Sequence, residues 1–300
     1  MPMLGALGSL SAFGFMDIGE LMIGTLGIFS LGGSTTTTNE YTYATGAVVA
    51  GTALTAATEA GAAAGTSTLG IFALGATGAH SPYTDQYTYA TGAVAAGTSL
   101  TSGLLNGSAA GTSTLGIFAL GNGVVSPATT STTNEYTYAT GAVAAGTSLT
   151  SGSVAGMAAG NSTLGIFALG GSTTTTNEYT YATGAVVAGT ALTSNGGYGA
   201  AAGNSTLGIF ALGINTTTTN EYTYATGAVV AGTALTKSTY YGSAAGTSTL
   251  GIFALGNTGA YSPYTDQYTY ATGAVVAGTA LTEDSKLGVV AAGNYNGGLS

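Results

Sequence analysis

The sequence predicts an all-β protein, a six-bladed β-propeller whose blades each contain four short antiparallel strands. Two stretches that recur at regular spacing along the 300 residues carry this prediction. The first ends Gly-Ile-Phe-Ala-Leu-Gly in most copies, and its phenylalanines are Phe29, Phe72, Phe118, Phe167, Phe210 and Phe253. The second reads Glu-Tyr-Thr-Tyr-Ala-Thr-Gly in most copies, and its first tyrosines are Tyr41, Tyr87, Tyr136, Tyr179, Tyr222 and Tyr268. Units of 43 to 49 residues with four strands each fit propeller blades.

The Gly-Ile-Phe run is expected to be a strand buried on both faces, because it is too short for a useful helix and is bounded by turn residues. From each Phe to the next Tyr the distance is 12, 15, 18, 12, 12 and 15 residues, whereas from that Tyr to the next Phe it is always 31. One connection therefore varies in length within an otherwise constant unit, as expected of stacked repeats.

One unit, residues 200–242, illustrates the four expected strands. Strand A covers residues 200–202, strand B 206–212, strand C 221–226 and strand D 228–236. The small residues of strands A and B suit the crowded region near the propeller axis. The tyrosines of strand C are expected to pack their rings between blades and to reach water with their hydroxyls.

The two ends of the chain are expected to close the ring. Residues 288–293 match strand A with no strand B after them, whereas the first strand B, which begins at Thr25, has no matching strand A before it. We therefore expect the C-terminal strand to join the N-terminal blade, which leaves no free edge at the closure. The propeller then covers residues 25–300, and the apolar residues 1–24, from Met1 to Gly24, form a separate docking segment.

The composition excludes several classes of function. Only 4% of the residues are charged, the net charge is −9, and the only basic residues are Lys237 and Lys286, so nucleic-acid binding is not expected. The absence of Cys excludes thiolate metal sites and thiol catalysis. Residues 1–24 contain no basic residue and are interrupted by Asp17 and Glu20, which argues against a secretory signal and a membrane span.

The repeats resemble known families. Residues 28–33, followed by Tyr41 and Leu54, resemble the kelch-type repeat, which has an apolar strand ending in Gly-Gly, a later Tyr and a hydrophobic fourth strand. Most copies read Leu-Gly instead of Gly-Gly, and the Trp and Arg of the kelch fourth strand are missing. The repeats also look like divergent repeats of tailed-bacteriophage virion proteins. This resemblance covers residues 25–293 and implies a kelch-like propeller in a virion.

The B–C and D–A connections are expected to share one end of the propeller, which we call the variable face because these connections differ between copies. The A–B turns read Gly-Thr-Ser or Gly-Asn-Ser and the C–D turns read Thr-Gly, and together they form the constant face. Aromatic and small polar loops on a rigid scaffold are typical of recognition, although exposed loops also vary without function. The candidate binding residues are His80, Tyr83, Asn195, Tyr198, Lys237, Tyr240, Tyr241, Tyr261, Tyr264, Glu283, Asp284 and Lys286.

Each copy keeps one carboxylate at the start of strand C. Asn39-Glu40 becomes Asp85-Gln86 in the second copy and Asp266-Gln267 in the last. A calcium site needs several converging oxygen ligands, and one carboxylate per blade is few. We favour side chains that accept backbone hydrogen bonds at a loop–strand junction, while cation binding remains an alternative.

No catalytic constellation is found. Without Arg there is no cluster for hydrolysis of sialic acids, and His80 alone completes neither a serine triad nor a histidine metal site. Glu283 and Asp284 are adjacent in a variable loop, which does not suit a glycosidase pair. We therefore predict no catalytic residue, no metal site and no cofactor.

The leading expectation is a non-enzymatic structural protein of a tailed-bacteriophage virion, mounted on the head or tail as part of a homo-oligomeric assembly. Its variable face would bind a host-surface glycan or protein or another virion protein, and residues 1–24 would dock it onto the particle. One alternative is a bacterial cell-surface or secreted adhesin that binds glycans through the same loops. Another is a self-assembling β-solenoid fibre.

Overall fold

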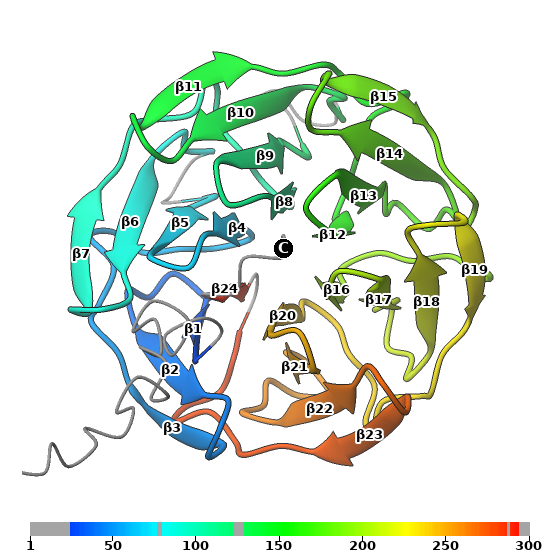
Figure 1. Cartoon of the computed structure of the whole chain (residues 1–300). Coiled ribbons are helices and arrows are strands. Elements are labelled where there is room, and N and C mark those ends of the chain that lie inside the picture. Colours follow the sequence, from blue (N-terminus) through cyan, green and yellow to red (C-terminus); the bar gives the residue numbers. More distant parts are fainter. Residues whose placement is uncertain (1–24, 77–79, 123–128, 287–288, 294–300) are drawn as a thin grey trace, which may run out of the picture.

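The computed structural model, which describes residues 25–76, 80–122, 129–286 and 289–293, contains six four-stranded antiparallel sheets arranged in a ring (Figure 1). The predicted six-bladed propeller is therefore confirmed, and the solenoid alternative is wrong for this chain because the ring is closed. Strands are the regular elements of the described residues, and none of these residues forms a helix that could span a membrane. The expected docking segment, residues 1–24, lies outside the described residues.

The four strands of each blade lie side by side, in order from the axis to the rim. The innermost strands are β24 (Val290–Gly293), β4 (Ala62–Gly65), β8 (Ser108–Gly111), β12 (Met157–Gly160), β16 (Ala200–Gly203) and β20 (Ser243–Gly246). The second strands are β1 (Leu26–Ser30), β5 (Leu69–Ala73), β9 (Leu115–Ala119), β13 (Leu164–Ala168), β17 (Leu207–Ala211) and β21 (Leu250–Ala254). The third strands are β2 (Thr38–Thr42), β6 (Thr84–Thr88), β10 (Thr133–Thr137), β14 (Thr176–Thr180), β18 (Thr219–Thr223) and β22 (Thr265–Thr269). The outermost strands are β3 (Ala47–Ala50), β7 (Ala93–Ala96), β11 (Ala142–Ala145), β15 (Ala185–Ala188), β19 (Ala228–Ala231) and β23 (Ala274–Ala277).

The C-terminal strand closes the ring, as predicted. Strand β24 pairs antiparallel with β1, with Ala292 opposite Ile28 and Val290 opposite Ser30. Blade 1 is therefore built from both ends of the described chain, in the order β24-β1-β2-β3, and blades 2 to 6 follow in sequence. The closure pairs the inner edge of β1, which would otherwise be free.

The hydrophobic core lies between blades rather than inside one sheet. Successive side chains of a strand point to opposite faces, so Ile71 of β5 packs toward Phe118 and Tyr136 of blade 3, while the next residue, Phe72, packs toward Ile28 of blade 1. Six such clusters, one at each blade junction, bury both faces of the second strands. This explains why the Gly-Ile-Phe run is apolar at consecutive positions.

Strand lengths and one packing detail differ from the prediction. In blade 5, strand C begins two residues earlier than expected, at Thr219, and strand D ends at Ala231 rather than at 236. The chain beyond strand D still bonds to the B–C connection, because the Leu235 amide donates to the Thr217 carbonyl. The expectation that strand C hydroxyls reach water is wrong, since Tyr222 is fully buried and Tyr224 nearly so.

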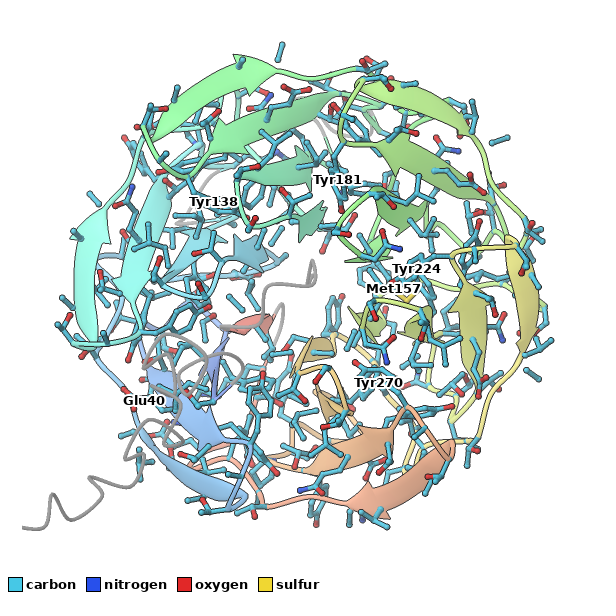
Figure 2. The ribbon with its side chains drawn as sticks, in the orientation of Figure 1. Glu40, Tyr138, Met157, Tyr181, Tyr224 and Tyr270 are labelled. Carbon is cyan, nitrogen blue, oxygen red and sulfur yellow. The ribbon has the colours of Figure 1, made fainter. Side chains whose placement is uncertain are left out.

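The second tyrosine of each copy directly follows the third strand and, in blades 2 to 6, lies over two glycines of its own blade. A Cβ atom placed on Gly203 would lie 2.4 Å from the Tyr224 hydroxyl, and one placed on Gly208 would lie 2.8 Å from it. Glycine therefore recurs at these two positions to leave room for the tyrosine, and not because the backbone there needs a positive φ. Figure 2 labels four of these second tyrosines, Tyr138, Tyr181, Tyr224 and Tyr270, which surround the axis.

Candidate functional site

Backbone hydrogen bonds hold the B–C and D–A connections together at one end of the propeller. Isolated antiparallel bridges join them in all six blades, for example Thr35 with Thr58 and Thr216 with Thr239. A parallel bridge then joins the D–A connection to the next blade, as between Tyr240 and Gly256. The predicted variable face therefore exists as one surface, and its loops are fixed by main-chain pairing.

The D–A connections place a ring of residues around the axis on this face. Each ring residue stands two positions before an inner strand and has a positive φ of 53° to 58°. Main-chain bonds link neighbours, since the Asn106 amide donates to the Ala60 carbonyl and the Tyr198 amide to the Ala155 carbonyl. The described members of this axial ring are Ala60, Asn106, Ala155, Tyr198 and Tyr241.

Three predicted tyrosines meet at this ring. The ring centroids of Tyr198 and Tyr241 are 4.7 Å apart, those of Tyr198 and Tyr240 5.0 Å, and those of Tyr240 and Tyr241 4.3 Å. Burial, followed by a hydrogen bond and electrostatic interaction with Tyr240, raises the pKa of Tyr241. Burial, followed by electrostatic interaction with Tyr240, also raises the pKa of Tyr198. The three side chains, which we call the tyrosine cluster, form a compact aromatic surface.

Other predicted residues extend this surface over blade 6. The Lys237 ammonium lies 4.1 Å from the centroid of the Tyr264 ring, which is a cation–π contact. The Tyr264 side chain is 43% exposed, and Tyr261 is 40% exposed. Tyr261 also acts electrostatically on Tyr241, which places it near the cluster.

A groove between blades 4 and 5 shares one loop with the tyrosine cluster. Its volume is about 580 Å³, and Asn195 lines it together with Ile214. Six hydroxyl side chains complete the lining, namely Ser172, Thr174, Thr193, Ser194, Thr216 and Thr218. The loop that supplies Ser194 and Asn195 to the groove supplies Tyr198 to the tyrosine cluster three residues later. The groove is large enough for part of a small ligand.

The remaining predicted residues do not join this site. Tyr83, which is 58% exposed, and His80 lie on the B–C connection of blade 2. The Nδ1 atom of His80 is buried without a hydrogen-bond partner. Glu283 and Asp284 are exposed on the last D–A connection, where Lys286 donates its amide to the Leu31 carbonyl. These residues share the variable face but are spread around it.

The axial channel is too small to be the binding site. Its volume is about 70 Å³, and its walls come from the small residues of all six inner strands together with Met157, which Figure 2 labels. A ligand pocket normally measures about 300 Å³ or more, so the channel holds at most a few water molecules.

The side chains at the start of strand C join neighbouring blades. The Thr55 amide and hydroxyl of blade 1 each donate 2.6 Å hydrogen bonds to the Asp85 carboxylate of blade 2. The other five junctions repeat the amide bond to the corresponding Asn or Asp. The favoured structural interpretation is thereby supported, and no group of acidic or His residues suited to a metal occurs among the described residues.

The next residue of strand C takes part in a second set of side-chain hydrogen bonds between neighbouring blades. The Tyr222 hydroxyl donates to a Glu178 carboxylate oxygen at 2.5 Å, and in blades 2 and 6 Gln86 and Gln267 instead donate to a tyrosine hydroxyl at 2.6 Å. Three further tyrosines repeat the bond to Glu. Burial, followed by the hydrogen bond to Glu178, raises the pKa of Tyr222.

Sequence reasoning missed the axial ring residues Ala60, Asn106 and Ala155, and it did not foresee the groove. One signal was available for the ring, because each of these residues directly precedes a glycine that leads into an inner strand. The groove leaves no such signal, since its walls combine loops that are far apart in the sequence.

Comparisons with known proteins show which fold the chain shares and do not indicate its function. No protein-family model matches the sequence, and no curated protein matches it either. In three dimensions 428 chains of solved structures match, so the fold is widely shared and does not indicate one function. One of them, the structure of YjhT, aligns over 86% of this chain and 97% of its own with a TM-score of 0.64 and 8% sequence identity. This likeness shows a shared propeller fold, and the kelch-type and phage resemblances remain predictions.

Proposed function

We propose that the chain is a non-enzymatic recognition protein that binds a neutral carbohydrate of a host surface through its variable face. The observation that carries the proposal is the hydroxyl-lined groove between blades 4 and 5, whose loop continues into the tyrosine cluster. The loops of the constant face differ far less between blades, since its C–D turns all read Thr-Gly.

The chemistry of the site favours a sugar. Hydroxyl and amide side chains both donate and accept hydrogen bonds, as sugar hydroxyls do, while tyrosine rings offer flat apolar surfaces with polar tips. Asn195 and Tyr198 supply both kinds of contact from one loop. With no Arg in the chain and Lys237 held against Tyr264, anionic sugars and phosphates have little cationic surface to bind. A neutral saccharide fits this pattern better.

We propose that the chain is part of the virion of a tailed bacteriophage, where the propeller would act in host attachment. The support is the resemblance of the repeats to phage virion proteins. A bacterial adhesin would use the same groove and the same tyrosines, so the two candidates differ in where the chain is carried and not in how it binds. Docking through residues 1–24 belongs to the virion candidate.

The test uses the full chain on an array of neutral and sialylated oligosaccharides. The variant carries Tyr198→Ala and Tyr241→Ala, and Ala60 and Ala155 show that the axial ring accepts Ala with the same backbone. We expect the variant to lose binding to a neutral oligosaccharide about thirtyfold or more, because truncated tyrosine hot spots cost about 2 kcal/mol or more. Tyr83→Ala, an exposed tyrosine of blade 2, is the control and should bind normally.

Two results would contradict the proposal. One is that no neutral oligosaccharide binds the folded chain. The other is that the double variant and the Tyr83→Ala control bind equally well, which would separate the binding activity from the tyrosine cluster.

A further inference from the structure

The connection between β17 and β18 contains a turn whose backbone is strained at Ile214. The Thr216 amide donates to the Gly213 carbonyl at 3.1 Å, which closes a four-residue turn. Its two central residues, Ile214 and Asn215, have φ values of 52° and 56°. Positive φ at both central positions is typical of a type I′ turn, which strongly favours Gly and Asn. Asn215 suits this turn, whereas a β-branched residue with positive φ is a genuine outlier.

Two other blades have glycine at the strained position. The B–C connections of blades 1 and 4 have the same length as that of blade 5, and each closes the same turn. In the place of Ile214 they carry Gly33 and Gly171, each with a φ of 61°. Glycine adopts this conformation without the steric cost that a Cβ atom brings. The chain therefore retains an unfavourable residue at a position where its own repeats show a favourable one.

Packing between the blades does not require Ile214. At the junction of blades 3 and 4 the Val154 side chain covers Gly171, with 3.9 Å from its Cβ atom to a Cβ placed on the glycine. At the junction of blades 4 and 5 the order is reversed, because Gly197 lies beside the Cδ1 atom of Ile214. A Cβ atom on Gly197 would meet no atom closer than 3.5 Å, and the φ of Gly197 is not positive. A side chain at 197 and glycine at 214 would thus fill the same space without strain.

The Ile214 side chain lines the groove between blades 4 and 5 and is only half-buried. The other residues that line the groove are the six with hydroxyl side chains and Asn195, so Ile214 supplies its one purely apolar side chain. Ligand sites combine apolar contacts with a few polar groups that fix the orientation of the ligand. Backbone strain that persists at such a place points to a function for the strained residue.

We propose that Ile214 is a specificity-determining residue, which contacts a methyl group of the bound saccharide. This role rests on the proposed function and narrows its ligand to neutral sugars that carry a methyl group, in an N-acetyl or a 6-deoxy substituent. The hydroxyl side chains and Asn195 pair with the polar groups of the sugar, while its methyl group packs against Ile214. An aliphatic side chain that stands alone among hydroxyl groups suits a compact apolar group better than a flat ring, which the tyrosine cluster can cover. Glycine at 214 would remove the strain and the contact together.

Isothermal titration of the full chain with oligosaccharides of N-acetylglucosamine, of rhamnose and of glucose tests this contact. The parent should prefer one of the two methyl-bearing sugars to the glucose oligomer, and its choice distinguishes an N-acetyl from a 6-deoxy ligand. Ile214→Gly should bind the preferred sugar about tenfold more weakly or worse, because one methylene in an apolar pocket changes discrimination roughly 10–200-fold. The melting temperature of Ile214→Gly should stay the same or rise by up to about 3 °C, because the turn loses its strain.

Asn215→Gly is the matched control, because it changes the same turn at the neighbouring residue. The Asn215 side chain is exposed and is not among those that line the groove. This variant should bind like the parent. A loss of binding in Asn215→Gly would assign the effect to the backbone of the turn and overturn the proposal.

Three further results would also overturn it. They are equal affinity of Ile214→Gly and the parent, a parent that does not prefer a methyl-bearing sugar, and an Ile214→Gly variant that melts more than a few degrees below the parent. The last result would make Ile214 a structural residue. In all of these cases the proposed function stands as long as the parent binds a neutral saccharide. A parent that binds none would contradict the proposed function itself, and the role of Ile214 with it.

Discussion

Tyr222 in β18 and Tyr224, which directly follows this strand, allow a matched test of how the blades are held together. The Tyr222 hydroxyl donates to the Glu178 carboxylate of blade 4 across the blade junction. Two residues later, the Tyr224 hydroxyl is buried without a hydrogen-bond partner and lies against Gly203 and Gly208. Replacing either tyrosine by Phe removes one hydroxyl oxygen atom, and the two positions are only two residues apart, so the two variants differ mainly in the bond that is lost.

We expect Tyr222→Phe to be destabilising and Tyr224→Phe to be neutral or stabilising. A hydrogen bond to a charged group contributes about 1.5–3 kcal/mol, and the lower value applies here because Glu178 is half-buried and water can reach it. A cooperative unit of 300 residues has an unfolding entropy near 0.6 kcal/mol per degree, so Tyr222→Phe should lower the melting temperature by about 2–3 °C. Removing the Tyr224 hydroxyl removes a buried polar group that has no partner, which relieves a desolvation cost.

The assay is calorimetry of the two variants beside Glu178→Gln. The glutamine variant should melt close to the parent, because Gln86 and Gln267 already make this link in blades 2 and 6. Equal melting of Tyr222→Phe and Tyr224→Phe would refute the view that the ring of Glu–Tyr bonds stabilises the blade junctions. A large loss in Tyr224→Phe alone would reverse the assignment of the two hydroxyls.

Two further predictions concern the buried tyrosines. Burial raises the pKa of Tyr43, Tyr89, Tyr181 and Tyr224 well above 10, so the folded state keeps these protons while the unfolded state releases them. The contribution of these tyrosines to the free energy of unfolding is therefore fully present below pH 10, and above pH 10 it falls by up to about 1.4 kcal/mol per pH unit for each tyrosine. Melting curves between pH 8 and 12 measure this loss. A melting temperature that does not change over this range would contradict the prediction. Gly203→Ala should lower the free energy of unfolding by about 1–3 kcal/mol, because its Cβ would lie 2.4 Å from the Tyr224 hydroxyl. The Gly203→Ala/Tyr224→Phe double variant should regain most of this stability. Simple additivity in the double-mutant cycle would show that the contact is not the cause.

The fold was predictable because each blade repeats the same four strands in the same order. The constant spacing of 31 residues from Tyr to the next Phe fixed the repeat, and the unmatched segment at residues 288–293 indicated how the ring closes. The partners of strand C could not be predicted in the same way. The bond from Tyr222 to Glu178 joins residues 44 positions apart, and one sequence does not show which blade face each side chain occupies.

The candidate site was predictable only in part, for a related reason. Loop variability indicated the correct face, because framework strands cannot change while exposed connections can. The meeting of Tyr198 with Tyr240 and Tyr241 depends on how two successive D–A connections turn toward the axis. That turn is set by a positive φ at non-glycine residues, which sequence patterns do not reveal.

The backbone of the axial ring bears on the choice between the proposed recognition role and simple loop drift. A non-glycine residue in the left-handed region costs about 1–2 kcal/mol, and glycine would remove that cost. The C–D turns on the constant face need a similar positive φ and use glycine in all six copies, as at Gly46 and Gly227. The five described members of the axial ring never use it, although the chain contains 52 glycines. Under the proposed function, Tyr198 and Tyr241 would keep their side chains at this backbone cost because they contact the ligand, whereas Ala60 and Ala155 would not need to.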